Sequence, residues 1–284
     1  MSVVRWLAFL ACVCMFVLPA YAQPTVSTFS GAATDTKFTE YGNGVGITSM
    51  VMNDGPAGAD KNYYRLTTAG VGSTLNMIAF DLTAPGATAH VVGDFDFRIG
   101  GTAGTHADGI GIALLPTSVY GATGNGPSIT EEGSSAKDGA LGFGLDTFNN
   151  GGIDIGNSGL PNGSDADEVS VNILSPASNS YFLYAVDMWG LTNSGYNLHQ
   201  DSVDDTATPF DHCHFTVDIG TGGAMVSVTI TSHQQDPTGG QPFTVLNALV
   251  PGVTPYEMRL GFGGRTGGAN DGHDIANVNI TFSP

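Results

Sequence analysis

Hydrophobic and polar positions alternate with a period of two residues in many short runs along this chain. Such alternation turns one face of a β-strand toward a core and the other toward solvent. Clusters of Gly, Asn, Asp and Ser separate the runs, and no long run has the helical period of about 3.6 residues. The pattern therefore predicts an all-β fold, arranged as a sandwich or a barrel. The clearest runs span residues 62–68, 75–82, 90–99, 168–174, 215–219, 225–232 and 277–282.

The composition agrees with a glycine-rich β protein. The chain has 284 residues, of which 41 are Gly, and no internal repeat or linker follows the first 22 residues. We expect residues 23–284 to form a single domain, because this length is sufficient to bury a full core. The stretch 193–211 is acidic and poor in apolar residues. It is predicted to be a long surface loop or an insertion.

The first 22 residues have the features of a secretory signal peptide. Arg5 precedes an apolar run over residues 6–18, and Ala20 and Ala22 are small residues at the spacing that a signal peptidase reads. The run is shorter than the roughly 20 residues that cross a bilayer, although an uncleaved membrane anchor is the alternative. Cleavage near Ala22 predicts a secreted protein, extracellular or periplasmic, that does not insert into a membrane.

The cysteine content indicates whether disulfides are expected, and the net charge limits the possible binding partners. Cleavage would remove Cys12 and Cys14 and leave Cys213 alone, so no intrachain disulfide is expected. The formal net charge is −18, and loss of Arg5 would make it one unit more negative. Such a surface repels nucleic acids and anionic membranes, and it favours divalent cations.

Three segments carry the functional signal. Asp108 lies in an Ala-Asp-Gly turn that leads directly into an apolar run. Residues 144–150 read Gly-Leu-Asp-Thr-Phe-Asn-Asn and are followed by Asp154. Near the C-terminus, the chain reads Arg-Leu-Gly-Phe from Arg259, Thr-Gly-Gly-Ala-Asn from Thr266 and His-Asp-Ile from His273.

In this order and at these separations, the segments resemble those of the legume-type (L-type) lectins in the concanavalin A-like lectin/glucanase superfamily. Residues 64–68, Tyr-Arg-Leu-Thr-Thr, extend the resemblance upstream, so that it covers essentially all of residues 23–284. The chain is most similar to a secreted, bacterial-type member. The resemblance implies a jelly-roll β-sandwich of two antiparallel sheets, with a ligand site on loops at the edge of the curved sheet.

The segment after residue 145 has the chemistry of a calcium site. Asp146, Asn150 and Asp154 offer two carboxylates and an amide oxygen within a short glycine-rich stretch, which suits a hard cation. The backbone carbonyl of Phe148 would add a fourth oxygen, because alternate groups of an extended segment face the same side. The resemblance implies that these four residues bind calcium. The alternative is a turn in which Asx side chains cap their own backbone.

The same resemblance implies that a second metal site is missing. In plant members, a transition metal uses a glutamate two residues before the first Asp and a histidine on the next strand. Gly144 stands at the first of these positions and Glu168 is aligned with the second. The remaining ligands are too few and too hard for manganese or zinc, so calcium alone is predicted.

A sugar site needs a carboxylate that accepts from adjacent hydroxyls, an amide, and an aromatic face. Asp108, Asn150 and Phe148 supply these groups, and each matches its position in the lectin motifs. The alternative for Asp108 is an ordinary turn-forming Asp before Gly. Asn270 and Asp271 lie in the late loop that sets sugar preference in this family. The resemblance also implies a cis peptide bond between Ala107 and Asp108.

One departure from the family concerns residues 115–141, which lack the Gly-Gly-x-Leu-Gly-Leu loop that donates a backbone N–H to the sugar. Gly139 and Gly142 are the candidates for this role. The alternative that this protein keeps the fold and the calcium site but has lost sugar binding therefore stays open. Elsewhere, alternation predicts that Cys213 faces the core between two outward histidines, and His273 is expected to be structural.

The sequence thus predicts a secreted, calcium-dependent carbohydrate-binding protein that is not an enzyme and that could form homo-oligomers. A glycoside hydrolase on the same sandwich is the first alternative. It would need two carboxylates about 5 to 9 Å apart, whereas Gly144 and Phe148 flank Asp146 at the alternating positions. The second alternative is a structural or adhesive surface protein.

Overall fold

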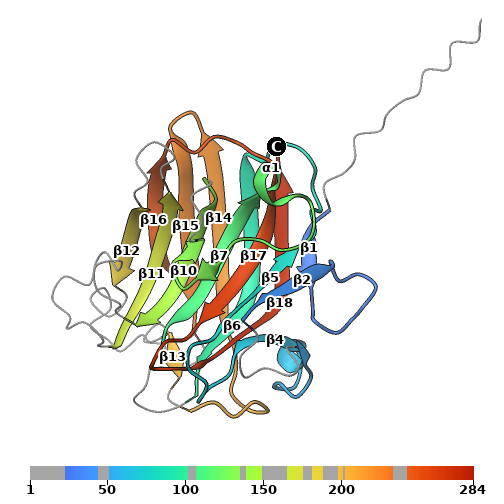
Figure 1. The fold of residues 1–284 in the computed structure, drawn as a ribbon, viewed down its shortest axis with the longest axis vertical. Helices are drawn as coiled ribbons and strands as arrows, with labels where there is room; N and C mark the ends of the chain where they lie inside the picture. The colour runs from blue at the N-terminus through green and yellow to red at the C-terminus, as the bar shows by residue number, and fades with distance from the viewer. Residues whose placement is uncertain are drawn as a thin grey trace, which may run out of the picture.

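The structure is a computed structural model that describes residues 23–43, 51–101, 107–134, 139–148, 165–174, 181–187, 198–200, 202–232 and 242–284, with the backbone alone for 134, 165–174 and 181–187. Most of these residues belong to β-strands in two stacked layers (Figure 1). No helix in this part of the chain is long and apolar enough to span a membrane.

The larger layer, here called the back sheet, contains nine of the described strands. Seven of them follow the order β16 (Phe243–Pro251), β15 (Gly223–Thr231), β14 (Asp211–Gly220), β6 (His90–Gly100), β18 (Gly272–Ser283), β4 (Tyr63–Thr67) and β3 (Val51–Met52). The other two are β1 (Thr25–Ser27), antiparallel to β18, and β13 (His199–Gln200), parallel to β6.

The second layer, here called the front sheet, is antiparallel throughout its seven described strands. Their order is β12 (Tyr181–Asp187), β11 (Asp165–Leu174), β10 (Leu141–Phe148), β7 (Gly109–Pro116), β17 (Met258–Arg265), β5 (Leu75–Phe80) and β2 (Phe38–Gly42). A small hairpin of β8 (Ile129–Thr130) and β9 (Gly133–Ser134), and the short helices η1 (Ala59–Lys61) and α1 (Thr117–Tyr120), complete the described elements. The predicted all-β sandwich of two antiparallel sheets is confirmed.

The alternating runs in the sequence correspond to strands with one buried face. In β14, Cys213 and Phe215 are buried, whereas His212 and His214 point outward and contact aspartates of β6. The predicted inward orientation of the cysteine is therefore confirmed. Aromatic rings from the two sheets meet in the core, and the centroids of Phe143 and Phe215 are 5.0 Å apart. This packing fixes the sheets against each other.

Three glycines side by side on the front sheet admit the β8–β9 hairpin. Gly111 lies opposite Gly144 on one side and Gly263 on the other. A Cβ atom at these positions would lie 1.8, 1.5 and 2.0 Å from backbone oxygens of the hairpin. Only glycine allows two backbones to approach so closely. Gly144 is therefore required by the hairpin that crosses the sheet.

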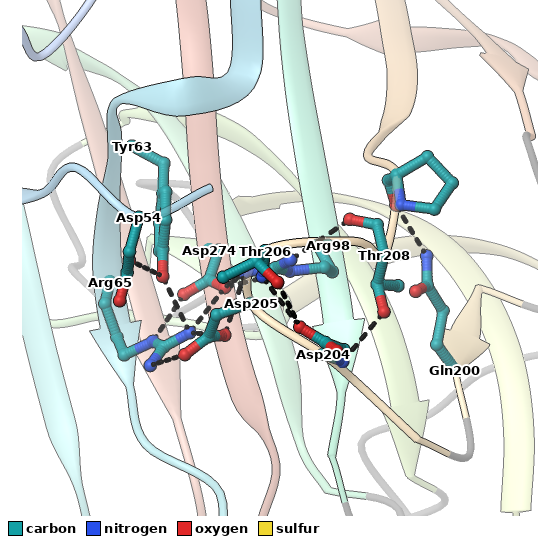
Figure 2. A network of polar contacts seen from close by, with 11 residues as sticks. Asp54, Tyr63, Arg65, Arg98, Gln200, Asp204, Asp205, Thr206, Thr208 and Asp274 are labelled. Carbon is teal, nitrogen blue, oxygen red and sulfur yellow. Dashed lines mark hydrogen bonds and ion pairs between the residues drawn. The ribbon is translucent and has the colours of Figure 1, made fainter. Parts of the chain in front are cut away.

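The acidic stretch 193–211 was expected to be a surface loop or an insertion, and its described residues 202–209 do form an irregular surface segment. The described residues on either side are held more closely, because Leu198 and Phe210 are buried and β13 joins the back sheet. Figure 2 shows the reason, because Asp205 forms ion pairs with Arg65 and Arg98. Opposite charges on the sheet hold this acidic segment against it.

Candidate functional site

The ends of three neighbouring front-sheet strands meet at the candidate site. Asp108 immediately precedes β7, Asp146 lies near the end of β10, and Arg265 is the last residue of β17. In the strand register, Gly109 is opposite both Asp146 and Arg265. Two of the motifs singled out in the sequence therefore come together at one edge of the sheet.

Hydrogen bonds hold the Asp108 turn from both sides. The Asp108 N–H donates to Arg265 O at 3.0 Å, and the Asp108 carbonyl accepts from Thr147 N–H at 2.8 Å. The Thr147 hydroxyl also donates to this carbonyl, at 3.2 Å. Because Thr147 lies between Asp146 and Phe148, the proposed sugar-binding turn is bonded directly to the proposed calcium-binding segment.

The Ala107-Asp108 peptide bond is trans, since the described residues contain no cis peptide bond. The expectation of a cis bond is therefore wrong. In the trans arrangement both amide groups have partners, because Ala107 N–H donates to Asp271 Oδ2 at 3.1 Å and Asp108 N–H donates to Arg265 O at 3.0 Å. This arrangement satisfies the buried N–H groups of the turn.

The site contains more negative than positive charge. Arg265 Nε lies 3.2 Å from Asp108 Oδ2, and Arg265 Nη1 donates to Glu131 Oε1 at 2.5 Å. Glu132 and Asp146 are also close enough to act on this guanidinium. Burial lowers the pKa of Arg265, but the four carboxylates raise it overall. We call these five residues the Arg265 cluster; all four of its carboxylates are buried.

Burial and the excess of negative charge raise the pKa values of two of these acids. Burial raises the pKa of Asp108 to about 6, with Arg265 opposing the shift and Glu132 adding to it. Burial also raises the pKa of Glu131 well above its usual range, and Glu132 and Asp108 reinforce this. Asp108 Oδ2 and Glu132 Oε1 have no hydrogen-bond partner within the described residues. The cluster can therefore accept hydrogen bonds or stabilise a cation.

The predicted calcium ligands are only partly described. Asp146 is buried, and its Oδ1 accepts the Phe148 N–H at 2.9 Å at a bulge in β10. This is the Asx-type capping that the sequence left as an alternative. Asn150 and Asp154 lie outside the described residues. Among the described ones, no three His, Cys, Asp or Glu residues form a group that could hold a metal ion.

Gly144 and Glu168 stand at the two positions that bind a transition metal in the plant lectins. The β8–β9 hairpin occupies the space next to Gly144, where a Cβ atom would lie 1.5 Å from Glu131 O. No longer side chain could point there without moving the hairpin. Glu168 lies opposite Asp146 in the register of β10 and β11, but its side chain is outside the described atoms.

The glycines proposed to donate an N–H to the sugar are in the wrong place. Gly142 is paired with both neighbours of β10 inside the sheet, and Gly139 precedes the strand. Both are near the end of β10 that is remote from Asp146, and Gly139 is on the order of 20 Å away at the usual rise of a strand. The stretch 115–141 instead reaches the site through Glu131.

Asn270 supports a neighbouring loop, because its Oδ1 accepts the Gly70 N–H at 2.6 Å. The half-buried Phe148 lies beside the site at the end of β10. Arg265, Glu131 and Glu132 were not predicted from the sequence. The only available signal was that residues 131–132 form the single Glu-Glu pair of the chain, between short apolar runs.

Solved structures with a similar fold include lectins. The exoplasmic/lumenal domain of VIP36 in its Ca²⁺/Man-bound form matches with a TM-score of 0.55 and 14% identity, over 92% of this chain and 89% of that one. The seed lectin of Lotus tetragonolobus matches with a TM-score of 0.50 and 16% identity, over 88% and 94%. No protein-family model and no curated protein matches the sequence. The structural likeness shows that this chain has the fold of the L-type lectins.

Proposed function

We propose that this protein is a secreted, calcium-dependent lectin that binds glycans at the edge of the front sheet. The observation that carries the proposal is the hydrogen-bonded junction of the Asp108 turn with Thr147. It couples the carboxylate suited to sugar hydroxyls with the segment suited to calcium. Residues 1–22 would direct secretion as a signal peptide.

Each residue has a distinct proposed role. Calcium would be held by Asp146, the Phe148 carbonyl, Asn150 and Asp154, and it would offset part of the excess negative charge. Asp108 would accept hydrogen bonds from sugar hydroxyls, since Oδ2 has no hydrogen-bond partner within the described residues. The Phe148 ring would pack against the sugar, and Asn150 would bind through its amide.

Asn270 would contribute from the late loop. This role is secondary, because its amide oxygen already accepts the Gly70 N–H. The structural neighbours support the assignment as a whole, since structures of VIP36 contain Ca²⁺ together with Man3GlcNAc, Man2 or Man. A glycan is therefore the proposed partner, with oligomerisation a separate prediction.

We further propose that the protein does not hydrolyse glycans. Gly111, Gly144 and Gly263 occupy the centre of the front sheet, and the hairpin covers them. Asp108 and Glu131 have raised pKa values, but one guanidinium binds both and both are buried. Two carboxyl groups that contact the same guanidinium are not arranged to flank a glycosidic bond from opposite sides.

A glycan array probed with and without calcium tests the proposal. We expect binding that requires calcium and that is lost in Asp108→Asn, while the variant keeps its calcium affinity. Binding that survives chelation, or that is unchanged in Asp108→Asn, would contradict it. Release of reducing sugar from polysaccharide would favour the hydrolase. Elemental analysis should find about one calcium and no stoichiometric manganese or zinc.

A further inference from the structure

We propose that Asp271 is a positioning residue that holds the Ala107-Asp108 turn in the orientation needed for sugar binding. Asp271 is fully buried, and its Oδ2 accepts the Ala107 N–H at 3.1 Å. Its role in sugar binding rests on the proposed function, whereas its hold on the turn does not. A bond from an N–H to a carboxylate is stronger than one to a neutral oxygen, which suits a residue that fixes a turn.

The turn has two different supports. On the front-sheet side, Asp108 is bonded through its own backbone to Arg265 and Thr147. On the back-sheet side, the Asp271 carboxylate accepts the Ala107 N–H, and the buried His273 ring also interacts with the Ala107 backbone. Since Ala107 is itself buried, water cannot replace this bond without local opening. Loss of the carboxylate would allow the turn to rotate about its front-sheet bonds and redirect the Asp108 side chain.

Asp271 is in turn fixed by β4 and β18. The Thr67 hydroxyl donates to Asp271 O at 2.8 Å and lies 2.7 Å from His273 Nδ1. Because a hydroxyl has one hydrogen, His273 Nδ1 must donate to Thr67. Burial lowers the pKa of His273 to about 4, so this ring is neutral near pH 7. The backbone beside Asp271 is thus tied to a second strand of the back sheet.

A third strand reaches the same carboxylate. His199 Nε2, on β13, is 3.1 Å from Asp271 Oδ2, and both side chains are fully buried. The segment after β13 is anchored in turn, because Gln200 Nε2 donates to Pro209 O at 3.3 Å and Arg98 Nη1 donates to Thr208 O at 3.1 Å (Figure 2). The acidic segment therefore contributes to the support of the turn.

Two substitutions of Asp271 separate a positioning role from a general structural one. Asp271→Asn keeps an oxygen of nearly the same shape that can accept the Ala107 N–H, and Asp271→Ala removes it. We expect glycan affinity to fall about tenfold or more in the Ala variant and by less than about threefold in the Asn variant. Calcium affinity, measured by titration, should be unchanged in both, since Asp271 is not a proposed ligand.

Hydrogen exchange of the Ala107 amide provides a readout that needs no glycan. Exchange should be slow in the wild type and in Asp271→Asn, and at least about 100-fold faster in Asp271→Ala. Cys213→Ala, which shortens a buried side chain of the back sheet, is the matched control and should change neither exchange nor affinity. If Asp271→Ala does not fold, His199→Gln should still accelerate Ala107 exchange, by a smaller factor.

The outcomes distinguish the two proposals. Unchanged Ala107 exchange in Asp271→Ala, or in His199→Gln where that variant must be used, would overturn the hold on the turn. Faster exchange with unchanged glycan affinity would overturn the positioning role. A wild-type protein that binds no glycan in the presence of calcium would overturn the proposed function, and Ala107 exchange would still decide whether Asp271 holds the turn.

Discussion

Two arginine clusters in this protein differ in their charge balance. On the back sheet, Arg65 and Arg98 face Asp205 and Asp274, so that two positive charges meet two negative ones (Figure 2). The contacts are short, with Arg98 Nη2 at 2.6 Å from Asp274 Oδ2 and Arg65 Nη2 at 2.6 Å from Asp205 Oδ1. We call this group the balanced cluster.

At the edge of the front sheet, the Arg265 cluster places a single guanidinium among four carboxylates. Here Asp108 Oδ2 and Glu132 Oε1 have no hydrogen-bond partner within the described residues, and burial raises the pKa of Asp108 to about 6. A balanced, hydrogen-bonded ion cluster is typical of a structural role. Four buried carboxylates around a single guanidinium carry excess negative charge, which indicates a site that binds something further.

The strongest way to break the balanced cluster is Arg98→Ala. This side chain is buried, and its guanidinium carbon is 4.5 Å from the ring centroid of Phe210. Its loss leaves Asp274 buried with less compensation and should lower the free energy of unfolding by about 3 to 5 kcal/mol. Urea denaturation measures this change. A loss below about 1 kcal/mol would show that the cluster is not structural.

A change of pH should change the protonation of the buried His273, whose ring interacts with the Ala107 backbone beside the Arg265 cluster. Its folded-state pKa of about 4 lies below the unfolded value of 6.5, so the unfolded state binds more protons between these values. The contribution of His273 to stability should therefore fall as pH drops from 6.5 to 4, by up to about 3 kcal/mol, while the raised pKa of Asp108 acts in the opposite sense. In urea unfolding at several pH values, the stability of the wild type should therefore fall more, or rise less, toward pH 4 than that of His273→Gln. Equal slopes would contradict the assignment.

Removing a charge from the Arg265 cluster should raise the stability of the protein, whereas removing one from the balanced cluster should lower it. Glu132→Gln removes one of the four buried carboxylates and should stabilise the calcium-free protein by about 1 to 2 kcal/mol. The pKa of Asp108 should fall as well, because Glu132 helps to raise it. Denaturation in chelator and NMR titration of Asp108 measure these effects. Glu40→Gln, at an exposed acid of β2, is the control; destabilisation by Glu132→Gln alone would contradict the charge argument.

The smallest expected effect comes from a substitution that distinguishes glycan binding from calcium binding. Phe148→Ala should weaken glycan binding by about 1 kcal/mol, since one apolar face is lost. Calcium affinity should be unchanged, because the proposed ligand is the backbone carbonyl. Calorimetric titrations of both ligands test this. A fall in calcium affinity with glycan affinity intact would mean that the two roles are reversed.

The sequence by itself determined the strands and part of the site. Alternation over residues 90–99 and 225–232 identified β6 and β15, because burial on one face of a strand is written in neighbouring residues. The same rule placed Cys213 in the core. Asp108 and Asp146 were also proposed from the sequence as site residues, since each lies in a short motif that resembles one of the L-type lectins.

Only the tertiary structure decided which groups surround those residues. Glu131 reaches Arg265 because a hairpin crosses three glycines on separate strands, and Asp271 reaches Ala107 from a loop more than 160 residues later in the chain. Such contacts depend on strand register and on how the sheets stack. Neither is encoded in the local pattern of hydrophobic and polar residues, since a strand with the same alternation can pair with many partners. The excess of charge at the site therefore became visible only once the chain was folded.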